Sequence, residues 1–332
     1  MKSQITLSQA IDGYLLDAHA RQLSPKTIAD YSTTFRKFRA RAGDPPLRTI
    51  TRDTVREFLA ELRTHPVSMS HGVAPRPARR LSKKTVLNIH IGLSALWSWA
   101  VREGFADTNI VRAIKAPRPE QKVIEPYSQE DVSALLTCCE HTAAYTRPGK
   151  SQCANSRPTA LRDRAVILLL LDTGMRAGEM CADPKRGTPG LLVRDLDLRE
   201  PSLKVFGKGD KERILPISPS TSKTIWRYLA TRPDAAPDEP LFLSTKGGAF
   251  TVGGLGQLLT KLGRRADVQD AHPHRFRHTF AINLLRNGAN AYELQAMLGH
   301  TSLEMVKRYL KLAQVDIEAA HKRASPVANW HL

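Results

Sequence analysis

Apolar side chains recur every three or four positions through the first 113 of the 332 residues. This spacing puts them on one face of a helix, so it predicts successive amphipathic helices. One helix is expected from about Thr6 to Arg21, and hydroxyl side chains that can cap predict further starts at Ser24, Thr51 and Ser82. Their apolar faces are expected to form a helical core. The apolar positions are Ile28, Tyr31, Phe35 and Phe38, then Val55, Phe58, Leu59 and Leu62, then Val86, Ile89, Leu93, Leu96, Trp97 and Ala100.

The second part of the chain mixes helical and strand patterns. Ser128 is typical of a capped helix start, and the apolar run 161–171 predicts a buried helix. Two apolar or alternating runs, 202–206 and 213–217, flank a glycine-containing turn, which predicts a β-hairpin. Helix starts are expected near Ser218, Thr251, His274, Asn290 and Thr301. The pattern therefore predicts a mainly α fold with a small β-hairpin or sheet.

Proline-rich stretches suggest how the chain is divided. Residues 114–126 hold three prolines and are expected to be an extended linker between a helical domain, 1–113, and a second domain, 127–315, followed by a C-terminal tail, 316–332. Two further segments are predicted loops. Residues 141–159 are interpreted as an insertion, while the basic, proline-rich stretch 66–81 fits a solvated insertion and a flexible arm that contacts phosphates equally well.

The charge narrows the class of partner. Fifty Lys and Arg residues against 32 Asp and Glu give a net charge of +18 and a pI near 10.0. Such an excess favours polyanions, nucleic acid first and anionic membrane second, over a basic protein whose charge serves only solubility. The sequence contains no apolar run long enough to span a bilayer, no secretory signal and no cysteine pair with metal-ligand spacing. We therefore expect a cytoplasmic protein with reduced thiols and no metal site.

Candidate chemistry lies in five separated groups. They are Arg176 with Glu179, Lys208 in the hairpin turn, His274 with Arg277, His300, and Tyr309. Residues three apart on a helix share a face, so Arg176 with Glu179 and His274 with Arg277 are expected to lie on common helical faces. Each group alone is weak, and Lys208 does not fit a phosphate-binding P-loop.

In this order and spacing the groups resemble the tyrosine recombinases, also called the phage-integrase family. The stretch from Leu23 to Thr27, continuing to Tyr31 and Phe35, is similar to the family's helical, SAM-like core-DNA-binding domain. The later groups resemble its mixed α/β catalytic domain. The resemblance covers nearly the whole chain and is strongest to compact Xer-type or transposon integrases.

The resemblance implies a site-specific DNA recombinase that cuts and rejoins strands through a 3′-phosphotyrosyl intermediate. Tyr309 would be the nucleophile, and Arg176 and Arg277 would stabilise charge on the phosphate oxygens, since guanidinium groups stay charged and bind phosphate bidentately. The covalent link stores the bond energy, so no cofactor is implied. The implied uses are integration or excision of a mobile element, or dimer resolution.

The resemblance also assigns the remaining site residues. Lys208 would be the general acid that protonates the leaving 5′-oxygen, and His274 would aid proton transfer from Tyr309. His300 would hydrogen-bond the scissile phosphate. Glu179 would orient Arg176 or a neighbouring basic group.

The implied partner is double-stranded DNA with specific recombination sites. Contacts to DNA are expected from basic residues of the first domain, namely Lys26, Arg36, Arg76, Arg79, Arg80, Lys83 and Lys84. Family members form a homo-tetramer in the synaptic complex, so this chain is expected to be a monomer or dimer without DNA, with an accessory or sister recombinase as a further partner. The tail, 316–332, would pass to a neighbouring protomer, against the alternative of a frayed end. Nucleoid association is expected when the protein is bound to DNA.

Three alternatives remain at this point. A type IB topoisomerase would use the same phosphotyrosine chemistry to relax supercoils, and a non-catalytic member of the fold would only bind DNA. A basic membrane-binding protein is a more distant alternative, because no basic amphipathic terminal helix is found.

Overall fold

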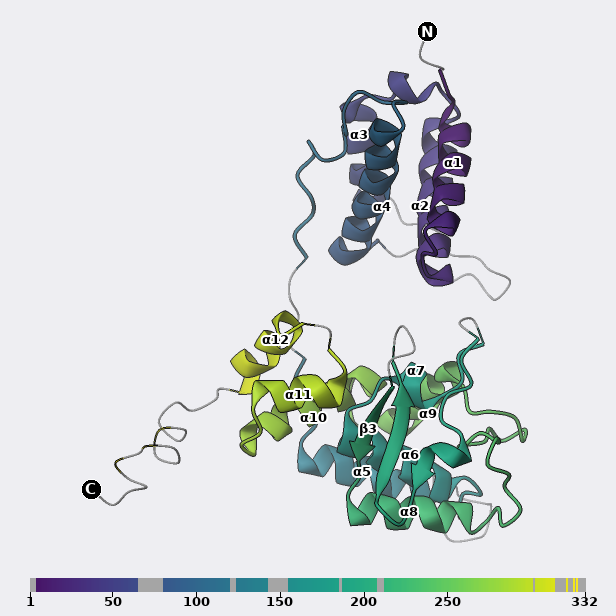
Figure 1. The fold of residues 1–332 in the computed structure, drawn as a ribbon, viewed down its shortest axis with the longest axis vertical. Coiled ribbons are helices and arrows are strands. Elements are labelled where there is room, and N and C mark those ends of the chain that lie inside the picture. The colour runs from purple at the N-terminus through teal and green to yellow at the C-terminus, as the bar shows by residue number, and fades with distance from the viewer. Residues whose placement is uncertain are drawn as a thin grey trace, which may run out of the picture. The chain divides into compact units, whose positions relative to one another are not determined.

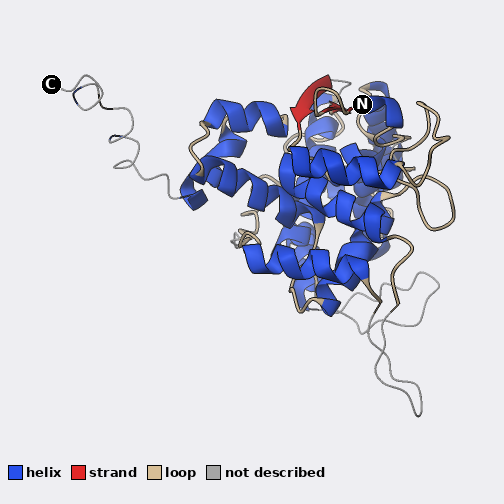
Figure 2. Cartoon of the chain, turned by 90° about the horizontal axis from the view of Figure 1, so that it is seen from below, coloured by secondary structure: helices blue, strands red, loops and turns tan. Residues whose placement is uncertain are grey.

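The structure is a computed structural model that describes residues 4–64, 80–119, 124–142, 155–184, 187–207, 212–300, 302–313, 321, 325 and 327. The chain divides into two compact units, Met1–Lys122 and Val123–Leu332. Helices dominate the described chain and the strands lie in one small sheet, in agreement with the predicted mainly α class (Figures 1 and 2).

The first unit is built from helices that begin where the sequence offers a cap. They are α1 (Leu7–Ala20), α2 (Pro25–Ala42), α3 (Arg52–Thr64) and α4 (Lys83–Arg102), with a short 3-10 helix, η1 (Leu47–Thr49). Thr6 forms a reciprocal capping box with Gln9, and Ser24 and Ser82 accept hydrogen bonds from the third residue beyond. Thr51 Oγ1 accepts from the Thr54 N–H at 3.2 Å. The four predicted helix starts are therefore confirmed.

Aromatic rings fill the core of the first unit. Phe35 and Phe38 on α2 are fully buried. Phe35 meets Tyr14 of α1 edge-on at 5.4 Å between ring centroids, and Phe38 meets Trp97 of α4 at 5.8 Å. The apolar stripes predicted from the sequence thus face one another, where edge-to-face pairs add to the stabilisation by burial. Ile114, the first residue of the predicted linker 114–126, also packs against this core.

The second unit has a helical framework around one small sheet. Its elements are α5 (Gln129–Glu140), α6 (Ala160–Thr173), α7 (Ala177–Met180), η2 (Val193–Asp195), β1 (Leu196–Asp197), β2 (Ser202–Phe206), β3 (Glu212–Pro216), α8 (Pro219–Leu229), α9 (Val252–Arg265), α10 (Pro273–Arg286), α11 (Ala291–Leu298) and α12 (Glu304–Ala313). The predicted buried helix is α6, which packs against α5, α8 and α10. Helices α10, α11 and α12 pack on one another (Figure 1).

The sheet is antiparallel with strand order β1-β2-β3. The predicted hairpin is confirmed, although its second strand begins at Glu212, one residue earlier than expected. The two-residue strand β1 was not expected, because so short a run carries no pattern. Leu203 and Leu215 face the core, whereas Ile214 is 72% exposed on the other face. Lys208, in the predicted turn, lies outside the described residues.

Two expected helix starts need correction, and several predicted loops lie largely outside the described residues. The helix expected near His274 is capped two residues earlier, by His272, whose Nδ1 accepts from the Arg275 N–H. Thr301 lies outside the described residues, and the following helix begins at Glu304. The loops 66–81 and 141–159 lie largely outside them as well, as does most of the tail. The predicted linker, 114–126, is held at both described ends: Ile114 packs on the core of the first unit, and the Glu125 carbonyl accepts from Arg275 in the second.

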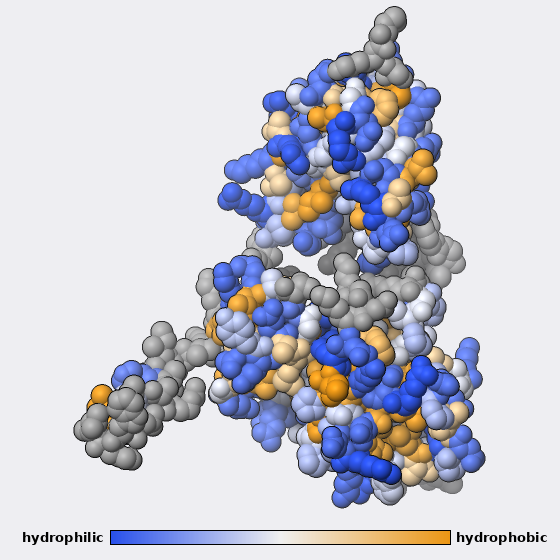
Figure 3. Space-filling view, viewed as in Figure 1, coloured by the Kyte–Doolittle hydropathy of each residue, from blue (hydrophilic) through white to orange (hydrophobic). Residues whose placement is uncertain are grey.

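Hydrophilic side chains cover most of the face shown in Figure 3, with apolar patches scattered among them. Within the described ranges, none of the helices combines the length and the apolar character needed to cross a bilayer.

Candidate active site

Arg277 is the centre of a buried cationic cluster. It lies on α10, is 5% exposed, and donates from Nη1 to the Gly174 carbonyl at 2.9 Å. Its Nη2 donates to the Leu298 carbonyl at 2.8 Å and to Nε2 of His300 at 2.9 Å. Burial, and then the nearby charge of Arg176, lower the pKa of Arg277 to about 10. The group still carries its proton at neutral pH.

Arg176 meets Glu179 in a way that differs from the predicted shared helical face. Arg176 is the N-cap of the four-residue helix α7 and has an extended backbone, so only Glu179 lies within the helix. The two side chains meet because the Glu179 carboxylate folds back onto the cap. It accepts from the Arg176 backbone N–H at 2.8 Å and from Arg176 Nη1 at 2.9 Å. Arg176 Nη1 also lies 3.4 Å from the Leu298 carbonyl, which Arg277 binds as well.

Arg213 is a third guanidinium that the sequence-based selection of site residues missed. Its Nη1 and Nη2 donate to the two oxygens of Glu179 at 3.1 and 2.9 Å, and its Nε donates to the Met297 carbonyl at 2.9 Å. Its side chain is 14% exposed. The alternation of β3 offered the signal, since Arg213 shares the inward face with the buried Leu215. A charged residue at an inward strand position needs a partner, and Glu179 is that partner.

Glu179 is ionised although it is buried. Desolvation alone would raise the pKa of its carboxyl group, but the hydrogen bonds from Arg213 and from the Arg176 backbone, with both guanidinium charges, lower that pKa below its ordinary value of 4.5. The carboxylate therefore holds two of the three arginines at neutral pH.

Tyr309, on α12, is buried against two histidines. It is 6% exposed, and its ring lies nearly parallel to that of His300, with 6.2 Å between centroids and 8° between planes. The His278 ring lies 5.3 Å away. Burial raises the pKa of Tyr309, and the charges of Arg277 and Arg308 only partly offset this. The tyrosine is therefore a neutral phenol at pH 7.

The histidines of the cluster are neutral as well. Desolvation, followed by the charge of neighbouring arginines, lowers the pKa of His300 and of His278 to about 4. Desolvation also lowers the pKa of His274, which lies on α10 one turn before His278. The interactions with His272 and with the charges of Arg277 and Arg176 add to this effect. Arginine can only donate, so Nε2 of His300 accepts and the ring proton lies on Nδ1. That Nδ1 is buried and has no hydrogen-bond partner among the described residues.

The structure thus brings five of the six predicted catalytic residues into one neighbourhood. They are Arg176, His274, Arg277, His300 and Tyr309. Lys208, the sixth, and the predicted DNA contacts Arg76 and Arg79 fall outside the described residues. The other predicted DNA contacts are exposed on α2, on α4 or just before α4, namely Lys26, Arg36, Arg80, Lys83 and Lys84.

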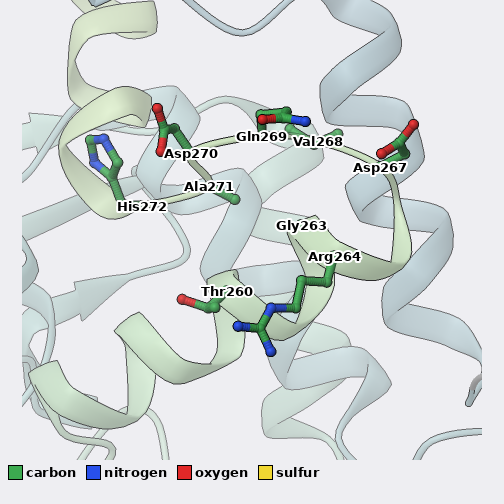
Figure 4. Close-up of a pocket in the computed structure, with 9 residues that line it drawn as sticks. All are labelled: Thr260, Gly263, Arg264, Asp267, Val268, Gln269, Asp270, Ala271 and His272. Carbon is green, nitrogen blue, oxygen red and sulfur yellow. The ribbon is translucent and has the colours of Figure 1, made fainter. Parts of the chain in front are cut away.

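A pocket of about 560 Å³ lies between the end of α9 and the loop that leads to His272 (Figure 4). Arg264, Asp267, Asp270 and His272 are its ionisable lining residues, and none belongs to the predicted catalytic set. Over the described part of the chain, no three His, Cys, Asp or Glu side chains gather closely enough to hold a metal ion.

Comparison with known proteins decides the family. A model of the Phage integrase family matches residues 129–315, and one of the family's N-terminal SAM-like domain matches residues 11–104. The chain belongs to the phage integrase family. This confirms the resemblance drawn from the sequence.

Relatives and solved structures agree with this family. The tyrosine recombinase XerC of Alcanivorax borkumensis is 30% identical over 317 residues, which cover 92% of this chain and 91% of the relative. The XerC of Pelobacter propionicus is 27% identical over 93% and 92% of the two chains. In fold, the chain is similar to the Tn1549 transposon integrase in complex with a circular intermediate DNA, with a TM-score of 0.70, 18% identity and coverage of 95% and 99%. It is also similar to a lambda integrase dimer bound to a core site, with a TM-score of 0.66, 19% identity and coverage of 91% and 97%.

Proposed function

We propose that this phage integrase family member is a site-specific recombinase that cuts and rejoins DNA strands, with Tyr309 as its nucleophile. The observation that carries the proposal is the meeting of Tyr309, His300 and Arg277 in one buried cluster, although they come from three different segments of the chain. A phenol beside a fixed guanidinium is suited to attack a phosphodiester.

The proposed reaction is a phosphoryl transfer in which the cut strand stays covalently bonded to the protein until it is rejoined. The Tyr309 oxygen forms a bond to the phosphorus, the bond to the 5′-oxygen breaks, and the 3′-phosphate stays on the protein. Rejoining reverses these steps with a 5′-hydroxyl of another strand. Arg277 and Arg176, which both reach the Leu298 carbonyl, would stabilise the charge that develops on the nonbridging oxygens.

Proton transfers complete the proposed mechanism. The phenol of Tyr309 must lose its proton, and His274, neutral at pH 7, would help accept it. Lys208 would give a proton to the leaving 5′-oxygen. His300 retains one buried N–H without a partner, which suits a hydrogen bond to a phosphate oxygen. Glu179 would hold Arg176 in place through the bonds described above.

The proposed wider assembly is based on what the family resemblance implies. Two solved structures of similar fold, the Tn1549 transposon integrase and the lambda integrase dimer, are complexes with DNA. The exposed basic residues of the first unit, Lys26, Arg36, Arg80, Lys83 and Lys84, would contact DNA phosphates here. We expect 1–113 and 127–315 to act as the core-binding and catalytic domains. A homo-tetramer would assemble at paired sites, with the tail, 316–332, passed between protomers and an accessory or sister recombinase where one is needed. The enzyme would work in the cytoplasm, on the nucleoid.

The test is a trapping experiment. DNA fragments retained by the full chain are sequenced to find the binding site, and a nicked version of that site is incubated with the protein. A covalent adduct on a denaturing gel is expected from the wild type and from Tyr292→Phe, whose tyrosine is 71% exposed on α11. None is expected from Tyr309→Phe. An adduct from Tyr309→Phe would show that the nucleophile is another residue.

Two further outcomes separate the alternatives. Wild type that binds the site but never forms an adduct would indicate a non-catalytic DNA-binding member. Relaxation of a supercoiled plasmid with a single site, without strand exchange between two sites, would indicate a topoisomerase. Exchange between two sites supports the recombinase.

A further inference from the structure

The chain that leads into the second unit is fastened to the helix that carries the active site. Arg275, on the first turn of α10, donates from Nε to the Glu125 carbonyl at 3.0 Å and from Nη2 to Asp131 Oδ2 at 3.1 Å. Its Nη1 donates to the carbonyl of Gln269, in the loop that borders the pocket of Figure 4. One side chain thus joins α10 to three other segments.

Tyr127 strengthens the same attachment. Its ring is 4% exposed and lies 4.1 Å from the Arg275 guanidinium, within cation–π distance. Its Oη accepts from the His272 N–H at 3.1 Å, and its own N–H donates to Thr279 Oγ1 at 2.8 Å. The segment 125–127 is therefore bound to the cap, the first turn and the second turn of α10. Although the prolines predicted an extended linker, its described end is fixed.

Arg275 lies between two residues of the proposed active site. His274 precedes it, and Arg277 follows two positions later on the same helix. We infer that Arg275 is a positioning residue: by clamping the first turn of α10 to segment 125–131, it fixes where His274 and Arg277 stand. The inference rests on the proposed function, since it concerns the same site.

Arginine is suited to this task and lysine is not. A guanidinium offers five donors in a rigid plane, so it can bond two carbonyls and a carboxylate while stacking on a ring. Lysine presents one compact charge and can keep only part of these contacts. Releasing the clamp would let the first turn of α10 shift, and a displacement of about 1 Å near reacting groups can cost roughly 100-fold in rate.

The experiment uses full-length Arg275→Gln and Arg275→Lys, with Arg286→Gln as the matched control. Arg286 is an exposed arginine at the other end of α10. At saturating nicked DNA, we expect the single-turnover rate of adduct formation to fall about 10- to 100-fold in Arg275→Gln and less in Arg275→Lys. The dissociation constant for DNA should change by less than about threefold. Arg286→Gln should match the wild type in both.

Hydrogen exchange provides a readout that does not need activity. Amides in the second turn of α10 bond to carbonyls of the first turn, so they should exchange at least about tenfold faster in Arg275→Gln than in Arg286→Gln, because the clamp restrains local opening. An unchanged adduct rate per folded Arg275→Gln molecule, or equal losses in rate and DNA affinity, would overturn the inference. Unchanged exchange would overturn it too, even if the wild type formed no adduct and the proposed function itself had failed.

Discussion

The carboxylate of Glu179 offers the sharpest test of how the cationic cluster is held. Its side chain is 5% exposed and binds two guanidiniums, from Arg213 and Arg176. Glu179→Gln keeps the shape of the side chain but removes its charge. It also replaces one acceptor oxygen with an amide nitrogen, which can only donate, and this nitrogen would face groups that can only donate.

The magnitude follows from the exposure of each partner. Arg213 is 14% exposed, so its pairing with Glu179 is a buried one, and breaking a buried pair costs roughly 3–5 kcal/mol. Arg176 is 36% exposed, and solvent screening limits its share to at most about 1 kcal/mol. The glutamine keeps one acceptor, so we expect the low end, about 3 kcal/mol in all. For a unit of this size that lowers Tm by roughly 6–12 °C.

The stabilisation by Glu179 depends on pH, and the lowered pKa of its carboxyl group fixes the direction of that dependence. The folded state lowers the pKa of Glu179 below 4.5, so the carboxylate stabilises the fold fully above that pH. The contribution is lost as the pH falls through the folded-state value, where the wild-type group takes up a proton. The difference in Tm between wild type and Glu179→Gln should therefore be large at neutral pH and shrink below pH 4.5.

Calorimetry of the full chain across this pH range measures the effect as the change in Tm of the unfolding transition that Glu179→Gln shifts. Glu140→Gln is the control, because Glu140 is 52% exposed and pairs with Arg164 at the surface, a contact worth at most about 1 kcal/mol. A Glu179→Gln protein as stable as Glu140→Gln at pH 7 would refute the reasoning. So would a loss of stability that stays constant below pH 4.5.

Three further outcomes are expected. Gly174→Ala should have a clearly lower Tm than Gly247→Ala. Both glycines have positive φ, which costs alanine about 1–2 kcal/mol, but only at Gly174 would the new Cβ lie 2.3 Å from Phe280. Equal Tm values would contradict this contact. The rate of adduct formation at subsaturating DNA should be constant above neutral pH and fall below pH 6.5, where His274 takes up a proton. Desolvation and neighbouring charged groups lower the pKa of His274 from 6.5, so a fall that begins above pH 7 would contradict its proposed role. DNA affinity should drop steeply with salt, and Lys84→Gln should reduce the slope of log K against log salt by about 1 if Lys84 contacts a phosphate.

The local features of the fold were the predictable ones. A cap at Ser24 followed by proline, or an apolar stripe such as Phe35 and Phe38, depends on residues within one or two turns, and these helices lie where the sequence places them. The same holds for the hairpin. Arg176 and Arg277 could also be selected together, although about a hundred residues separate them. The order and spacing of the motifs resemble a known family, and that family uses both arginines in one site.

The missed features depend on contacts between distant residues. The alternation of β3 puts Arg213 on the inward face, but nothing near it in the sequence indicates that its partner is Glu179, 34 positions earlier. Prolines in 114–126 correctly indicate an irregular backbone, yet the docking of Glu125 depends on Arg275, 150 positions later. Arg176 was expected inside a helix because three-residue spacing suits one, whereas the helix is too short to include it.

The partners of Arg277 explain how the site can hold this guanidinium in place without neutralising its charge. Gly174 is the left-handed C-cap of α6, and Leu298 is the last residue of α11, before the left-handed Gly299. Carbonyls at helix C-termini carry partial negative charge and lack partners within the helix. Arg277 satisfies two of them at 2.9 and 2.8 Å and makes no ion pair with a carboxylate in the described structure. A carboxylate in their place would compete with a phosphate for the guanidinium, whereas carbonyl dipoles orient it and leave its full charge. The carboxylate that is present, Glu179, binds the more peripheral Arg213 and Arg176 instead. The two kinds of partner are therefore divided: helix-end carbonyls orient Arg277, the central cation, and Glu179 holds Arg213 and Arg176 around it.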